Sequence, residues 1–199
     1  MKPTTRIIAV LGLMSGCVAF AQVAEFGVTG GASLLRNNSL VPVELGDGTS
    51  ADTKLADGFR LGFRITLNTY RFFGHEVGYA YNRTQLKIEN VEDFGMAIHQ
   101  GFYNFLAYAL PEGAPVRPFA TAGAHFANFV PPGASATSGG GDTNFGLNYG
   151  GGIKARLGPK FIIRFDVRQY HTPKPDFFVQ APTGWLRQTE VSAGFGIGI

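Results

Sequence analysis

Apolar side chains occupy every second position in one segment of this chain after another. From residue 161 onward, one face carries Phe161, Ile163, Phe165 and Val167, and the other carries Ile162, Arg164, Asp166 and Arg168. A repeat of two residues is the period of a β-strand whose two faces meet different surroundings. Eight segments follow this pattern or a weaker form of it: 25–35, 58–68, 75–87, 97–109, 117–129, 144–157, 160–171 and 186–199. The pattern predicts an all-β protein.

The connections between these segments alternate in length. The second, fourth and sixth connections are short (69–74, 111–115 and 158–159), whereas 36–57, 131–143 and 172–185 are long and 88–95 is intermediate. A bacterial transmembrane barrel has short turns at its periplasmic end and longer loops outside the cell. The segments also have the length of about 10 residues that a tilted strand needs to cross a bilayer. We therefore predict an eight-stranded antiparallel up-and-down transmembrane β-barrel.

The composition favours an apolar face that meets lipid. Aromatic residues make up 13% of the chain, charged residues only 16%, and there are 28 glycines. The faces opposite the aromatic ones carry repeated Arg and Gly, which suit a narrow polar lumen. A soluble lipocalin-like barrel or a sandwich shows the same period with its apolar face inward, and it remains the alternative.

The first 21 residues have the pattern of a secretory signal peptide. Lys2 and Arg6 precede an apolar stretch over residues 7–14, and Ala19-Phe20-Ala21 forms a small-x-small cleavage site. We therefore divide the chain into a signal peptide at 1–21 and a barrel domain at 22–199 that is exported to the outer membrane. No later run of about 20 apolar residues predicts a transmembrane helix.

The only cysteine of the chain lies inside this leader. Residues 14–17 resemble a lipobox in which Cys17 is lipidated, although Met14 stands where Leu is usual, so lipidation remains an alternative to cleavage after Ala21. The whole chain has 17 Lys and Arg against 14 Asp and Glu, and loss of Lys2 and Arg6 leaves 15 against 14. This near balance gives no basic patch of the kind that binds nucleic acid.

The mature chain resembles the family of small outer-membrane β-barrels typified by the OmpA transmembrane domain. The last strand resembles the signal that the barrel-assembly machinery recognises, with apolar residues at Val191, Ala193, Phe195, Ile197 and Ile199. The usual last residue is aromatic, and here it is Ile199. The resemblance implies outer-membrane lipid, lipopolysaccharide and the assembly machinery as partners. It does not imply a cell-wall tether, since we expect no peptidoglycan-binding domain.

The polar faces together predict a lumen that is rich in charge. We expect it to contain Arg60, Arg64, Glu76, Lys154, Arg156, Arg164, Asp166, Arg168 and Glu190. The interior of an eight-stranded barrel is just wide enough for side chains, so these charges must pair. The favoured interpretation is a structural ion network. The alternative is a narrow passive pore whose excess of Arg and Lys prefers anions.

The sequence predicts no enzyme, cofactor, metal or catalytic residue. Its histidines are His75, His99, His125 and His171, and Asp176 follows the last of them, but no nucleophile motif accompanies them. A lipid hydrolase is the less favoured alternative.

We also expect aromatic girdles at both membrane boundaries, formed by Tyr70, Phe72, Phe73, Tyr108 and Phe119 on the periplasmic side and by Tyr170 and Trp185 on the outer side. The leading hypothesis is a structural or surface-interaction barrel that displays the loops 36–57, 131–143 and 172–185.

Overall fold

Eight long strands form the wall of the protein in a computed structural model that describes residues 23–134, 141–177 and 182–199. The predicted signal peptide and Cys17 lie outside these residues. The long strands are β1 (Val23–Arg36), β5 (Gly58–Tyr70), β6 (Phe73–Ile88), β7 (Phe94–Tyr108), β8 (Val116–Val130), β9 (Asp142–Leu157), β10 (Phe161–Pro173) and β11 (Trp185–Gly198).

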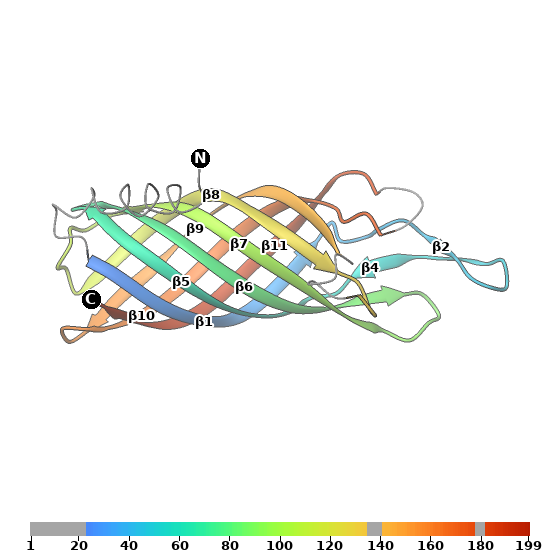
Figure 1. Ribbon diagram of the computed structural model, residues 1–199, viewed down its shortest axis with the longest axis horizontal. Coiled ribbons are helices and arrows are strands. Elements are labelled where there is room, and N and C mark those ends of the chain that lie inside the picture. Colours follow the sequence, from blue (N-terminus) through green and yellow to red (C-terminus); the bar gives the residue numbers. More distant parts are fainter. Residues whose placement is uncertain (1–22, 135–140, 178–181) are drawn as a thin grey trace, which may run out of the picture.

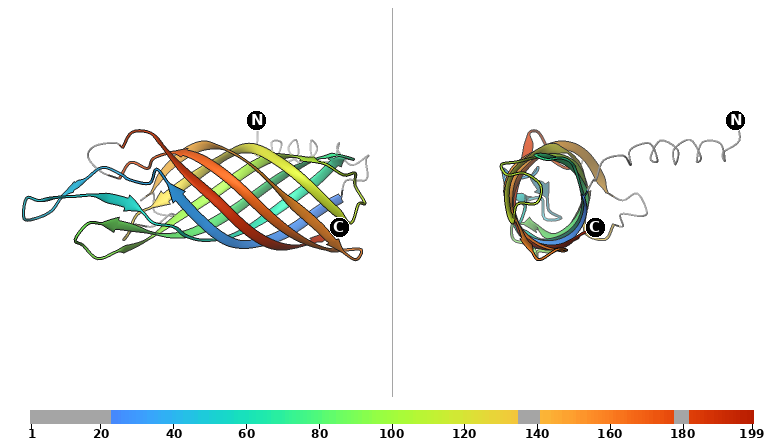
Figure 2. Two further views of the ribbon diagram at one scale, coloured as in Figure 1. Left: turned by 180° about the vertical axis from the view of Figure 1, so that it is seen from behind. Right: turned by 90° about the vertical axis from the view of Figure 1, so that its left-hand side faces the viewer.

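The wall is a closed antiparallel barrel. Each long strand pairs with its neighbours in the chain, and β1 pairs with β11 from Glu25–Gly198 to Arg36–Arg187. This pairing of first and last strands leaves the wall without a free edge. Figure 1 shows the wall from the side, and the view along its axis in Figure 2 shows a complete ring. A closed sheet satisfies all of its backbone groups internally, as a hydrocarbon surrounding requires. The predicted fold class is confirmed.

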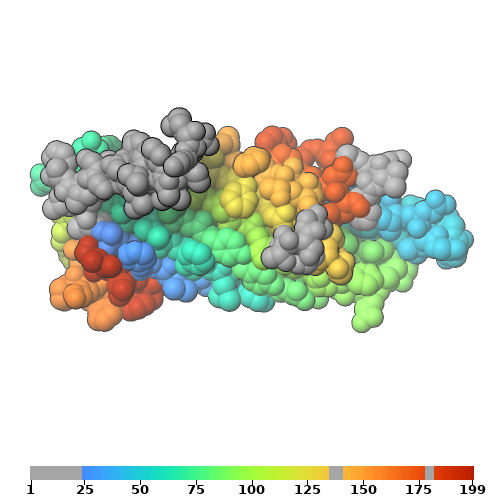
Figure 3. Space-filling view, in the orientation of Figure 1, coloured from blue at the N-terminus to red at the C-terminus, as the bar shows by residue number. Residues whose placement is uncertain are grey.

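The two ends of the barrel differ. Short turns join β5 to β6, β7 to β8 and β9 to β10 at one end, the turn end, where the C-terminus also lies (Figure 1). The opposite loop end carries three short strands that the sequence did not predict: β2 (Val43–Glu44), β3 (Ser50–Ala51) and β4 (Thr53–Leu55). β4 pairs with the end of β6, and β2 pairs with β3 in a hairpin that projects beyond the wall (Figures 1 and 3).

Large apolar side chains point outward along the strands. Phe63 on β5, Phe165 on β10 and Phe195 on β11 are each more than half exposed, whereas the inward residues Arg64, Arg164 and Ser192 on the same strands are buried. This is the reverse of a soluble barrel and is the arrangement that lipid favours. Among the described residues, no helix is long and apolar enough to cross a membrane.

Candidate functional site

The centre of the lumen contains a compact ion cluster that we call the central cluster. It consists of Arg60, Arg64, Glu76, Arg164, Asp166, Arg168 and Glu190, all of them buried. The residues come from β5, β6, β10 and β11, whose inward faces meet across a bore only wide enough for side chains.

Two carboxylates, Glu76 and Asp166, pair with two of the four arginines. Arg164 donates to Asp166 through Nε at 2.7 Å and Nη2 at 2.9 Å, and its Nη1 donates to Glu76. Arg168 Nη2 lies 2.7 Å from Glu76 Oε1 and 3.1 Å from Asp166 Oδ1. The two arginines therefore share both acids. Such forked contacts fix geometry as well as charge.

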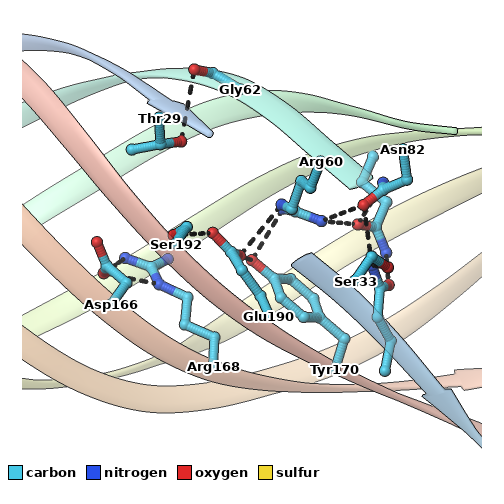
Figure 4. Close-up of polar contacts among 12 residues, drawn as sticks. Thr29, Ser33, Arg60, Gly62, Asn82, Asp166, Arg168, Tyr170, Glu190 and Ser192 are labelled. Atoms are coloured by element: carbon cyan, nitrogen blue, oxygen red, sulfur yellow. Dashed lines mark hydrogen bonds and ion pairs between the residues drawn. The ribbon is translucent and has the colours of Figure 1, made fainter. Parts of the chain in front are cut away.

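Glu190 is the third carboxylate and holds the remaining arginines. Its Oε2 lies 3.1 Å from Arg60 Nε and accepts the Tyr170 hydroxyl at 2.9 Å, while its Oε1 accepts from Ser192 at 2.6 Å (Figure 4). The same Oε1 lies 3.4 Å from Arg64 Nη2. The Arg60 guanidinium also lies over the Tyr170 ring, 4.8 Å from its centroid.

A layer of amides lies next to the central cluster on the side of the loop end. Gln100 accepts from Arg60 and donates to Gln188 at 2.7 Å, and Gln188 donates to Ser33 at 2.7 Å and to Asn82 at 3.0 Å. These side chains connect β1, β6, β7 and β11 across the bore. Because each of them is buried, the hydrogen bonds offset the cost of removing amides from water.

The loop end of the lumen is closed by an apolar cluster that we call the outer plug. Its members are Leu35, Leu40, Leu55, Leu86, Met96, Ile98, Ala127, Phe129 and Leu186. Leu40 and Leu55 come from the first long loop, whereas the others are inward side chains at the ends of wall strands. The sequence analysis assigned only charged residues to the lumen and did not predict this apolar cluster. The β4 segment brings Leu55 over the mouth, and the nearby inward faces are apolar to match it.

The turn end is closed by charge and by the β7–β8 turn. Lys154 donates to Glu25 and to the Tyr108 hydroxyl, the latter at 2.9 Å. Glu112 in the turn pairs with Arg117 and, at 2.9 Å, with Arg156. Backbone bonds from Glu112 to Arg71 and from Arg156 to Pro115 hold the turn against the barrel rim.

These layers leave little free space in the bore. The cavity beside Glu25 and Arg164 has a volume of about 20 Å³, and the one beneath Pro115 has about 10 Å³. Spaces of this size hold about one water molecule. These two cavities beside the buried ion pairs are therefore too small to form a continuous passage.

The structure brings seven of the nine predicted lumen residues into the central cluster and separates two from it. Lys154 is buried but pairs with Glu25, and Arg156 is partly exposed at the turn end beside Glu112. The prediction for Arg156 was wrong because its inward-facing position on β9 lies at the rim rather than in the bore.

Glu25 and Arg117 belong to the lumen and were missed. Glu25 could have been found, because Phe26 and Val28 mark the opposite face of its strand. Arg117 lies on a strand whose outward residues include Ala120, Ala122 and Ala124, so the sequence pattern did not separate its faces.

The prediction of the aromatic girdles was wrong for three residues. Tyr108, Phe119 and Tyr170 are buried in the lumen. There Tyr108 lies under the Arg117 guanidinium at 3.6 Å, and Phe119 lies under that of Arg164 at 4.5 Å. These rings cover the flat faces of buried arginines, a favourable cation–π arrangement. Tyr70, Phe72, Phe73 and Trp185 are exposed at the ends of the wall, as a girdle requires.

The histidines do not converge on one site. His75 and His99 face outward and contact the hydroxyls of Tyr103 and Tyr79, whereas His125 lies in the lumen 2.7 Å from Thr172 Oγ1. His171 faces outward and stacks on Tyr149. In the described part of the chain, the Asp176 carboxylate accepts no hydrogen bond from His171. The Asp176 backbone N–H donates to Asp142. Within the same ranges, no group of three His, Cys, Asp or Glu residues is placed to hold a metal ion.

Known proteins share this architecture at low sequence identity. OprG of Pseudomonas aeruginosa is 14% identical, with a TM-score of 0.58 over 88% of this chain and 96% of that one. The N-terminal barrel domain of P. aeruginosa OprF is 12% identical, with a TM-score of 0.54 over 89% and 97%. Neisserial surface protein A is 15% identical, with a TM-score of 0.55 over 88% and 95%. These likenesses concern the fold.

No curated protein sequence matches the chain significantly. A family model described as the outer membrane protein beta-barrel domain matches residues 7–197. That match covers nearly the whole chain, and it agrees with the closed wall and its apolar exterior. The chain belongs to the outer membrane protein β-barrel domain family, whose members lie in the outer membrane.

Proposed function

We propose that this protein is a closed outer-membrane anchor that displays its loops outside the cell and does not conduct solutes. The observation that supports this proposal best is the filling of the bore, with ion pairs at its centre, the outer plug at one end and the Glu112 turn at the other. A lumen packed in this way makes the wall rigid and leaves the loop end as the surface for contact with a partner.

The first long loop is built to project. Leu40 and Leu55 anchor its base in the outer plug, and Leu40 N donates to Thr53 O at 2.8 Å beside β4. Beyond this base, the β2–β3 hairpin is mostly exposed and extends past the other loops (Figure 3). A rigid base under an exposed tip suits a surface that meets a partner. The loops 131–143 and 172–185 complete the displayed set in our proposal.

Export and assembly are part of the same proposal. We propose that residues 1–21 are removed as a signal peptide, that lipid and lipopolysaccharide surround the wall, and that the assembly machinery recognises Val191, Ala193, Phe195, Ile197 and Ile199. The alternate spacing of these side chains on the outward face of β11 supports recognition from the lipid side. We further propose a non-enzymatic role, since the four histidines are dispersed over the barrel.

Cysteine labelling of intact cells tests the display. Ser50→Cys places a nearly isosteric thiol on the exposed hairpin, and Lys160→Cys places one in the β9–β10 turn as a matched control. A maleimide that cannot cross the outer membrane should label Ser50→Cys in intact cells and Lys160→Cys only after permeabilisation. The same assay on the wild-type protein measures any labelling of Cys17. Labelling of Lys160→Cys alone in intact cells would show the opposite orientation.

One observation favours the narrow pore as a second candidate. Four arginines of the central cluster face three carboxylates, so an opened lumen would attract anions. Conduction requires both the ion cluster and the outer plug to rearrange. A conductance measurement therefore separates the two candidates.

A further inference from the structure

We propose that the outer rim, which we define as Arg36, Arg187 and His171, binds the phosphate groups of a phosphorylated glycolipid in the outer leaflet. The inference rests on the proposed orientation, with the loop end outside the cell. It names a lipid partner and a position on the wall, and it concerns neither the lumen nor the displayed loops.

The sheet register places these three residues side by side. Arg36 on β1 is directly opposite Arg187 on β11, and Arg187 is directly opposite His171 on β10. Their neighbours Leu35, Leu186 and Gln188 are buried in the barrel, so the rim residues point away from it. Two guanidiniums and an imidazole therefore lie next to one another on the exterior of three neighbouring strands of the sheet.

The outer rim lies where the apolar wall ends. One row toward the turn end, Thr189 Oγ1 donates to Gln169 Oε1 at 2.8 Å. In the next row, the outward residues Ala32, Val191 and Val167 are all apolar, and Val191 and Val167 are about half exposed. Trp185, one outward position beyond Arg187, is also exposed, as expected for an aromatic side chain at a membrane boundary. The cations thus stand at the depth of lipid head groups.

The positive charge of the outer rim exceeds the charge that neighbouring carboxylates neutralise. Arg36 lies 3.3 Å from Asp57 in an exposed pair, whereas the Arg187 side chain makes no ion pair or hydrogen bond with any described residue. The Nε2 atom of His171 is buried and also lacks a hydrogen-bond partner among the described residues, so the two guanidiniums carry the exposed charge of the rim. Like charges directly opposite each other on a sheet repel, and an anion between them removes that repulsion.

A phosphate group matches two facing guanidiniums better than a protein carboxylate does. A guanidinium presents a planar fork of N–H donors that pairs with phosphate oxygens two at a time. A glycolipid also supplies acyl chains, for which Val191 and Val167 form the adjoining wall. At the turn end, in contrast, the outward strand residues Leu67, Phe73 and Phe161 are apolar, and the exposed cations Arg71 and Lys160 lie in the turns beyond the wall. This asymmetry matches a bilayer whose phosphorylated glycolipid lies in one leaflet.

Native mass spectrometry of the purified full chain tests the site. The probes are lipid A with two phosphates and the same lipid after enzymatic dephosphorylation. The variants are Arg36→Gln/Arg187→Gln and, as a matched control on the other rim, Arg71→Gln. We expect the wild type and the control to retain bisphosphorylated lipid A, and the double variant to bind it about tenfold more weakly, equivalent to about 1.4 kcal/mol.

Several outcomes would overturn the inference. These are equal binding by the double variant, equal binding of dephosphorylated lipid A to the wild type, and displacement of the lipid by inorganic phosphate alone. A difference in migration between boiled and unboiled samples verifies that each variant is folded, and Arg187→Gln alone provides a milder change. Cysteine labelling measures the orientation independently, so failure of lipid binding is distinguishable from failure of the proposed function.

Discussion

Arg168 Nη2 lies 2.7 Å from Glu76 Oε1 in the middle of the barrel, although the two residues are 92 positions apart in the chain. Both side chains are fully buried, and each has a second partner, because Arg168 also contacts Asp166 and Glu76 also accepts from Arg164. The pair connects β6 to β10 across the bore. Removal of either charge leaves another without its counterion in a buried site.

Glu76→Gln should therefore destabilise the barrel strongly. The substitution keeps the shape of the side chain and removes the negative charge that Arg164 and Arg168 share. Loss of one member of a buried ion pair costs about 3–5 kcal/mol. Urea unfolding in lipid vesicles, followed by tryptophan fluorescence, measures the change. Glu44→Gln, on the exposed β2 strand, is the matched control and should alter stability little. Equal stability of the two variants would contradict a structural role for the cluster.

The outward face of β10 provides a test of the lipid boundary. Phe165→Arg places a cation in the middle of the exposed apolar stretch, which costs about 2–4 kcal/mol near the bilayer midplane. Gln169→Arg makes the same charge change on the same face nearer the loop end, where the cost falls to about 0–1 kcal/mol. The same unfolding measurement compares them. A larger loss of stability for Gln169→Arg than for Phe165→Arg would contradict this position of the membrane boundary.

The tip of the β2–β3 hairpin should respond to pH through Asp47. The Thr49 hydroxyl donates to Asp47 Oδ1 at 2.6 Å and the Thr49 N–H donates at 2.9 Å, and these bonds lower the pKa of Asp47 below its usual value. A lowered pKa means that the ionised carboxylate stabilises the turn at pH values above the ordinary pKa. This stabilisation is lost as the pH falls through the pKa of Asp47 in the folded protein. Thr49→Val should raise the pKa of Asp47 toward that of a free carboxyl. NMR titration of the carboxyl carbon measures it, and an unchanged value would show that the hydroxyl contributes nothing.

Recognition by the assembly machinery should depend on the outward face of β11. Ile199→Phe restores the aromatic residue that the family resemblance leads us to expect at this position, so folded protein should accumulate faster in cells. Phe195→Ser removes the nearest aromatic side chain and should slow that accumulation. Pulse-labelling with gels of unheated samples gives both rates. If neither substitution changes the rate, this strand is not the feature that the machinery recognises.

Most of the wall could be predicted from the sequence because a period of two repeats for ten or more residues in most of the strands. The eight predicted segments overlap the eight long strands, and their ends differ by at most three residues. The short strands β2, β3 and β4 have two or three residues each, too few for a period to be visible. Their pairing depends on contacts with β6 and on the outer plug, neither of which has a local signal.

The lumen was predictable only in part. Inward positions on β5, β10 and β11 alternate with large apolar residues, so Arg60, Arg164 and Glu190 were assigned correctly to the inner face. Depth along the bore was not predictable, because the sequence does not specify strand stagger. For this reason Arg156 was expected among the other charges although it lies at the rim, and Tyr170 was expected outside although it donates to Glu190.

The conductance of the purified protein in a planar lipid bilayer tests the central claim most directly. The outer plug and the central cluster together predict no single-channel events, either for the wild type or for Arg164→Ala, because the plug remains closed when one guanidinium is removed. Stable, reproducible channel openings by the wild type would contradict a sealed lumen and would favour the anion-preferring pore instead.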